Sequence, residues 1–280
     1  MTGELLALAA AGGFGLTHFV SGLLSRRADG MAVALAAQIG GTLLILAVAP
    51  AVPAAGMTAP ALAWGALSGV GTAVGVACLY RSMGVGKFSV VVPLSDVATV
   101  ALPVVVGVAV LGDRPTPWAW CGIGAALPAM WLVSRTGDAS SGGDSASGTL
   151  LALVSGVGFA VQFLALAQAG TAAGPWPLAA GRITSVAVIA LLPLPRRALA
   201  RMPPRIAATA MAAGAVGTSA LALFALAERQ QPVTLAVVLT ALYPAIPAVL
   251  GLTVLRERLT GAQGAGLLLA TSAVVLVTVG

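Results

Sequence analysis

The sequence predicts an all-α integral membrane protein whose ten transmembrane helices form two inverted repeats of five. Three observations predict it: a composition too apolar for a globule in water, an internal repeat at a fixed offset, and five apolar runs in each copy. Hydrophobic residues make up 59% of the 280 positions, charged residues 8%, and the mean hydropathy is +1.03. Too little polar surface remains to cover a water-soluble globule, so lipid is the expected solvent.

One stretch of the sequence is repeated. Residues 101–122 read ALPVVVGVAVLGDRPTPWAWCG, and residues 245–266, which lie 144 positions later, read AIPAVLGLTVLRERLTGAQGAG. Prolines, glycines and an acid-Arg-x-Thr turn recur at matching positions, and the register never slips. Each copy therefore predicts a hydrophobic hairpin of two spans joined by a charged turn.

The first half contains five apolar runs near the length of about 20 residues that crosses a bilayer core of ~30 Å. The first run follows MTGE, which carries an acid and no base, so we expect a retained helix and not a signal peptide. The third run has small residues four apart, Gly65/Gly69 and Gly71/Gly75, which favour close helix packing. The predicted spans of this half are 5–24, 31–49, 61–80, 85–111 and 118–133.

A Gly/Ser-rich stretch, residues 135–148, reads RTGDASSGGDSASG and predicts a flexible linker between two domains, 1–134 and 149–280. The second domain repeats the plan of the first. Because five is an odd number, the second copy enters the membrane from the opposite side, which predicts inverted repeats suited to alternating access. The predicted spans of the second half are 150–169, 176–194, 206–227, 233–255 and 262–279.

Basic residues in the loops predict the orientation. One side of the membrane holds only Arg114 and Arg229. The positive-inside rule places the richer side in the cytoplasm, and therefore both termini in the periplasm of a bacterial inner-membrane protein. The residues of the richer side are Arg26, Arg27, Arg81, Lys87, Arg135, Arg196, Arg197, Arg201, Arg205, Arg256 and Arg258.

The basic clusters form no stripe that could follow a phosphate backbone, so nucleic acid is not an expected partner. Cys78 and Cys121 both lie inside apolar runs, which indicates small core residues and neither a disulfide framework nor a metal site. We therefore expect no cofactor and no bound metal.

The paired turns, residues 113–116 (DRPT) and 257–260 (ERLT), and the proline-containing fourth and ninth spans resemble the EamA-type, ten-helix branch of the drug/metabolite transporter superfamily. The resemblance covers the whole chain, although Arg256 replaces the glycine that precedes the acid in the first copy. Within the superfamily the plan is most similar to YddG-type amino-acid exporters. The resemblance implies a central cavity lined by helices 1 to 4 and 6 to 9, and export of small organic metabolites by a monomer or weak homodimer in the lipid bilayer.

Polar residues deep in apolar spans are costly in lipid and tend to face a bundle interior or water, so they are the candidates for a substrate site. Asp96 is the only acid that deep, about ten residues or ~15 Å into its span, which is near the bilayer midplane. The predicted substrate-binding residues are His18, Gln38, Asp96, Thr99, Gln162, Arg182, Thr240 and Tyr243.

Some of these residues belong to two groups, and each group lies on one face of its own helix. Asp96, Thr99 and Pro103 follow the spacing i, i+3 and i+7, and the 144-residue offset carries them onto Thr240, Tyr243 and Pro247 of the ninth span. A proline in lipid frees a backbone carbonyl and is tolerated where the helix lines a cavity or packs in protein. Either both faces point into a substrate cavity, or the prolines only curve two packed helices.

Two further candidates stay open to two interpretations each. His18 could carry a proton or be a hydrogen-bonded residue between helices, and its repeat counterpart Gln162 cannot titrate. Arg182 lies about six residues into its span, so it could line the cavity or extend outward to the interface.

The first functional hypothesis is export of neutral or aromatic amino acids by alternating access. The alternatives are a membrane-embedded enzyme acting on lipid, and an exporter of another metabolite or drug class. The sequence contains no GxSxG elbow and no histidine cluster, which argues against an enzyme. A channel would require a ring of repeated charges or carbonyls, and one deep acid does not supply it.

Overall fold

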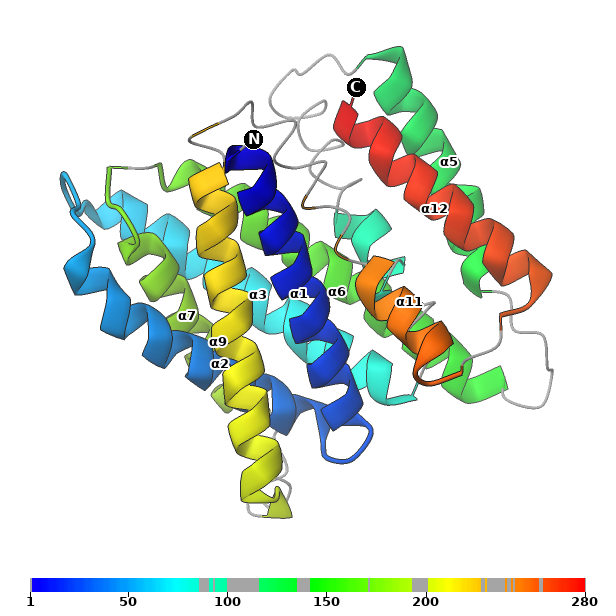
Figure 1. Cartoon of the computed structure of the whole chain (residues 1–280), viewed down its shortest axis with the longest axis horizontal. Coiled ribbons are helices and arrows are strands. Elements are labelled where there is room, and N and C mark those ends of the chain that lie inside the picture. The colour runs from blue at the N-terminus through cyan, green and yellow to red at the C-terminus, as the bar shows by residue number, and fades with distance from the viewer. Residues whose placement is uncertain are drawn as a thin grey trace.

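The computed structural model shows a bundle of helices (Figure 1). All regular structure in the described part of the chain is helical. The residues that the structure describes are 2–85, 91–92, 94–99, 116–134, 142–170, 172–192, 201–227, 230, 240, 243, 245–256 and 259–279. The helices are α1 (Thr2–Ser25), α2 (Gly30–Val48), η1 (Ala49–Ala51), α3 (Ala59–Val85), α5 (Pro117–Ser134), α6 (Gly142–Gln168), α7 (Trp176–Leu191), α9 (Pro204–Ala227), α11 (Ala245–Thr253) and α12 (Gly261–Val279).

Five helical segments in the described residues are long and apolar enough to cross a membrane. Two shorter apolar segments, Trp176–Leu191 and Gly264–Ala273, accompany them. The prediction of a multi-pass, all-helical membrane protein is therefore confirmed. The five segments are Gly3–Ser25, Gly30–Ala51, Ala59–Gly84, Ser147–Leu166 and Pro204–Ala227.

The start of α6 differs from the sequence prediction. We expected a flexible linker over 135–148, but α6 begins at Gly142, so the second part of that stretch is helical. The physical reason is cooperativity: each residue that extends an existing helix adds a hydrogen bond without a new nucleation cost. Residues 135–141 lie outside the described part of the chain.

The predicted fourth and ninth spans are described only in part. Of the fourth, residues 91–92 and 94–99 are described and helical; of the ninth, residues 240 and 243 and the helix α11 are described. The two acid-Arg turns fall largely outside the described residues, as do Pro93, Pro103, Arg114 and Arg229.

The third helix of each sequence repeat packs against the other repeat. Helix α3 contacts α6 and α7, while its repeat counterpart α9 contacts α1 and α2. Helices α5 and α12, which also correspond in the two copies, pack together at one edge of the molecule (Figure 1). The contacts between helices therefore recur in matched pairs, and most of them join the N-terminal to the C-terminal half.

Glycines make these crossings close. Gly65 lies against the backbone of Pro177, and Gly69 against the backbone of Gly181, where α3 crosses α7. At the matching crossing of α2 and α9, Gly214 lies against the backbone of Ala37. A methyl group at any of these positions would collide with the facing backbone, so only glycine permits the observed approach. The packing role expected for Gly65 and Gly69 is confirmed.

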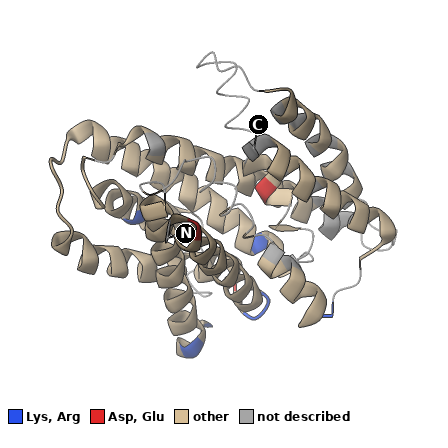
Figure 2. Ribbon diagram, turned by 45° about the horizontal axis from the view of Figure 1, so that its top comes forward, with Lys and Arg blue, Asp and Glu red and all other residues tan. Residues whose placement is uncertain are grey.

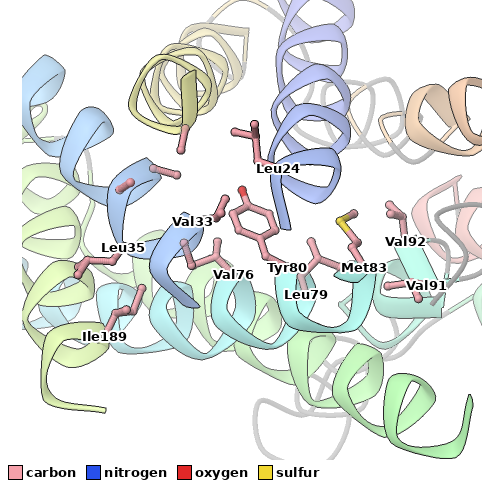
Figure 3. Close-up of a cluster of buried hydrophobic side chains, with 14 of the residues drawn as sticks. Leu24, Val33, Leu35, Val76, Leu79, Tyr80, Met83, Val91, Val92 and Ile189 are labelled. Carbon is pink, nitrogen blue, oxygen red and sulfur yellow. The ribbon is translucent and has the colours of Figure 1, made fainter. Parts of the chain in front are cut away.

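A core of apolar side chains fills the space between α1, α2 and α3. Leu79, Tyr80 and Met83 point from α3 toward Val33 of α2 and Leu24 of α1 (Figure 3). The three α3 side chains are at most 1% exposed. Tyr80 differs from its neighbours in carrying a polar hydroxyl group into this apolar core, where that group needs a polar neighbour.

The outer surface of the bundle is apolar. Leu5, Leu43 and Trp118 are among many large hydrophobic side chains that are more than half exposed. Figure 2 shows long stretches of helix without a single charged residue. Such a surface is stable in lipid and unstable in water, so polar groups that lie inside the bundle stand out as candidates for function.

Candidate substrate site

Asp96 and Tyr243 meet inside the bundle. The Asp96 carboxyl group is 3% exposed and lies close enough to the hydroxyl group of Tyr243, which comes from the other half of the sequence, for the two groups to interact. No basic side chain among the described residues pairs with Asp96. The two helical faces that the 144-residue offset related to each other therefore contribute an acid and a phenol to one place.

His18 of α1 lies among aromatic rings. Its ring centroid is 5.4 Å from that of Tyr243, 5.9 Å from that of Phe159 and 6.2 Å from that of Tyr80. Phe14, one turn earlier on α1, stacks edge-on against Tyr243 at 6.0 Å. The side chain is buried, and its Nδ1 atom has no hydrogen-bond partner among the described residues. One interpretation of His18 was a residue that forms hydrogen bonds between helices. The Nδ1 atom does not support that interpretation.

Gln38 of α2 and Arg182 of α7 form the second polar pair. Arg182 Nη1 donates a hydrogen bond of 2.8 Å to Gln38 Oε1, and both side chains are buried. The guanidinium group therefore points into the bundle and does not extend outward to the membrane interface. The two residues are separated by 144 positions, which is the repeat offset, so each is the counterpart of the other.

Gln162 and the two threonines of the predicted set make different contacts. Gln162 Oε1 accepts a 2.6 Å hydrogen bond from Thr72 Oγ1, which joins α6 to α3. Thr99 Oγ1 donates to the backbone carbonyls of Ser95 and Gly156. Thr240 Oγ1 donates to a backbone carbonyl of α1 at 3.4 Å. The hydroxyl groups of Thr99 and Thr240 thus bind backbone and serve packing. Gln162 contacts Thr72, which was not predicted, and the other five predicted residues present side-chain groups to one another or to aromatic rings.

The predicted site residues gather into two clusters. The first, which we call the acid–aromatic cluster, contains Asp96, Tyr243, His18, Phe14 and Phe159. The second, the arginine cluster, contains Arg182 and Gln38. Tyr80 lies between them, because its ring stacks on His18 and its hydroxyl group is within Coulombic range of Arg182.

Several contributors were not predicted from the sequence. Tyr80 and Phe159 provide rings around His18, and Thr72 holds Gln162. A signal existed for Tyr80, since it is one of two tyrosines in the chain and ends an otherwise apolar run. No comparable signal marks Phe159 or Thr72, because phenylalanine and threonine occur throughout transmembrane helices.

The side chains of the candidate site are of the kinds that bind organic molecules. Among the described residues, no group of three or more His, Cys, Asp or Glu side chains could hold a metal ion. Within the same residues, Cys78 and Cys121 are free thiols. What the site offers is a carboxyl group, a guanidinium group, amides and rings, which are the groups that bind a small amphipathic organic molecule.

Comparison with known proteins gives a family match for a little under half of the chain. Residues 146–279 match the EamA-like transporter family. The whole chain is similar in fold to a solved protein crystal structure, with a TM-score of 0.59 at 17% sequence identity over 99% of this chain and 96% of that chain. No curated protein matches the sequence.

The two comparisons bear on different properties of the chain. The similarity to the solved structure concerns the fold, and it extends over nearly all of both chains. The family match lies in the second half; together with the membrane-spanning helices it indicates a multi-pass membrane protein with an EamA-like transporter domain of the drug/metabolite transporter type.

Proposed function

We propose that the protein exports small amphipathic metabolites, first of all neutral and aromatic amino acids, across the bacterial inner membrane by alternating access. The observation that carries the proposal is that polar pairs of the described residues inside the bundle draw one residue from each half. These pairs include Asp96 with Tyr243, Gln38 with Arg182, and Thr72 with Gln162. A site shared between two halves opens to either side when the halves rock against each other.

We further infer ten spans arranged as two inverted halves, 1–134 and 149–280, joined by residues 135–148. Two observations support this arrangement. The helix contacts recur in matched pairs, with α3 on α6 and α7 and α9 on α1 and α2. In addition, Gln38 touches its own counterpart Arg182, and two equivalent residues meet only near the axis that relates their halves.

The proposed orientation places both termini in the periplasm. The excess of basic residues in the loops after odd-numbered spans supports it, because such loops stay in the cytoplasm. We propose that the working unit is a monomer or a weak homodimer, since each chain contributes both halves of the site.

The roles of the site residues follow from their chemistry. The Asp96 carboxylate binds the substrate ammonium group or takes up a proton, and the Tyr243 hydroxyl group orients that carboxylate. The rings of Phe14, His18 and Phe159 surround an apolar substrate side chain. Gln162 is held in place by Thr72 and offers its remaining amide group to the polar part of the ligand.

Reconstitution tests this function directly. Purified protein in liposomes is expected to move labelled L-phenylalanine and L-leucine in a saturable way, measured with and without a pH gradient. Protein-free liposomes and the Asp96→Asn variant serve as controls. Turnover of a membrane lipid without movement of any metabolite would show an enzyme instead, and saturable movement of a different compound class alone would reassign the substrate.

A further inference from the structure

We propose that Arg182 is the carboxylate-binding residue of this transporter, so that its substrates carry a free carboxylate group. The inference rests on the proposed function and adds to it the chemical class of the substrate and the direction in which the substrate lies. It is argued from the burial and the incomplete bonding of one guanidinium group.

Arg182 is a buried charge with no counter-ion in the described part of the chain. Its side chain is 8% exposed, and it donates a hydrogen bond to the neutral amide oxygen of Gln38. No carboxylate among the described residues pairs with it. A permanently charged group inside a membrane bundle is costly unless an anion compensates it, and nothing in the described part of the chain supplies that anion.

The free edge of the guanidinium group has the right form for a carboxylate. Gln38 occupies Nη1, while Nε is buried and has no hydrogen-bond partner. Arginine binds carboxylates in a bidentate manner through two parallel N–H groups on one edge of its plane. The edge that carries Nε is therefore open for an incoming carboxylate, and Gln38 holds the plane in position.

One serine hydroxyl group on the same helix is also without a partner among the described residues. Ser185 follows Arg182 by three residues on α7 and so shares its face, and its Oγ atom is fully buried and unpaired. Buried polar atoms almost always find partners, so an orphaned donor on the same face as an uncompensated cation indicates an absent polar ligand.

A purely structural role accounts for only part of these observations. A hydrogen bond between two equivalent positions would join the halves equally well with two glutamines, which carry no charge to bury. The positive charge, the free Nε atom and the unpaired Ser185 hydroxyl group have no use in such a link. Each has a use when a carboxylate binds.

This assignment also gives the substrate a direction. Tyr80 separates the arginine cluster from the acid–aromatic cluster. A substrate whose carboxylate lies at Arg182, between α2 and α7, would extend its remaining groups past Tyr80 toward the rings around His18. The group that reaches these rings is the side chain of the amino acid, because its ammonium and carboxylate groups share one carbon atom.

A competition assay tests the inference. Uptake of labelled L-phenylalanine into liposomes containing the full-length protein is measured with unlabelled L-phenylalanine or L-phenylalaninamide as competitor, since the amide keeps the ring and the ammonium group but lacks the carboxylate. We expect the wild type to prefer the acid by about 10- to 100-fold, the range given by one charge-assisted bidentate pair. Arg182→Gln should lose most of that preference, whereas Arg205→Gln, on an exposed residue of α9, should keep it.

The ratio of competition by the acid to competition by the amide distinguishes a role of Arg182 in substrate binding from a purely structural role. If Arg182 only joins the halves, its replacement lowers uptake while the wild-type preference for the acid persists, and that result overturns the inference. Should Arg182→Gln fail to fold, Ser185→Ala and the wild-type comparison remain: we expect a reduced preference in the first and a clear one in the second. Equal competition by acid and amide in the wild type overturns this inference alone, whereas absence of amino-acid uptake overturns the proposed function as well.

Discussion

The hydroxyl group of Tyr243 lies beside the carboxyl group of Asp96, although the two residues lie in different halves of the sequence. Asp96 is the acid that the sequence places deepest in an apolar span. The distance between the two groups must change if the halves move against each other.

The first prediction concerns this pair. Asp96→Asn should lower amino-acid uptake by about tenfold or more, because a hydrogen bond to a charged group contributes ~1.5–3 kcal/mol. Tyr243→Phe, which removes only the hydroxyl group, should lower uptake to a smaller extent. Uptake into liposomes at equal protein content measures both effects.

The matched control for this pair is Leu16→Ala on α1, where the side chain is 48% exposed on the outer surface. The control position proposed from the sequence alone, Val105, lies outside the described residues. Wild-type uptake by both Asp96→Asn and Tyr243→Phe would remove this pair from the substrate site.

A second prediction concerns the crossing of α3 and α7. Gly69→Ala should destabilise the protein by roughly 1–3 kcal/mol, because the new methyl group meets the backbone of Gly181 and the helices must move apart. Gly12→Ala is the matched control, since a methyl group there meets nothing within 4 Å and alanine favours the helix. Thermal unfolding in detergent should separate the two variants, and equal midpoints would contradict the close crossing.

Thr72→Val provides a third prediction. The substitution keeps the shape of the side chain and leaves Gln162 Oε1 without its 2.6 Å donor, so we expect a loss of about 1–3 kcal/mol in unfolding free energy. Thr271→Val should cost little, because Thr271 is exposed and bonds only within its own helix, to the carbonyl of Leu267. If both valine variants unfold alike, the bond between Thr72 and Gln162 does not stabilise the bundle.

The fourth prediction tests the orientation. In a variant with Cys78 and Cys121 replaced by alanine, a single cysteine at Thr2 should react with a membrane-impermeant thiol reagent in intact cells, and one at Ser141 should not. Replacement of Cys121 is necessary because this thiol is exposed. Labelling at Ser141 with protection at Thr2 would reverse the orientation inferred from the basic loops.

Much of the fold could be predicted because the signals are periodic and long. Apolar runs located α1, α2 and α9 to within a few residues, and small residues four apart located the crossings at Gly65 and Gly69. The start of α6 could not be located from the composition. A helix can extend cooperatively into a short Gly/Ser-rich stretch beside it, and the composition of that stretch does not show this.

The candidate site could be predicted in its residues but not in its pairings. Depth in an apolar span identified Asp96 and Arg182 as costly groups, since lipid tolerates neither. The sequence could not show that Arg182 bonds to Gln38, or that His18 lies among three rings, because these contacts depend on how distant helices cross. The sequence also did not indicate that the hydroxyl groups of Thr99 and Thr240 donate to backbone carbonyls.

The exchange of third helices between the halves has a consequence for how the protein is made. When the ribosome has finished α3, the surfaces that cover Gly65, Gly69 and Gly71 have not yet been synthesised, because they belong to α6 and α7. The newly inserted helices α1 and α2 likewise lack their contacts with α9 until α9 has been synthesised. The N-terminal half therefore has to persist in the bilayer with only the contacts among its own helices until the second half has been inserted, and insertion and assembly are separate stages of its biosynthesis.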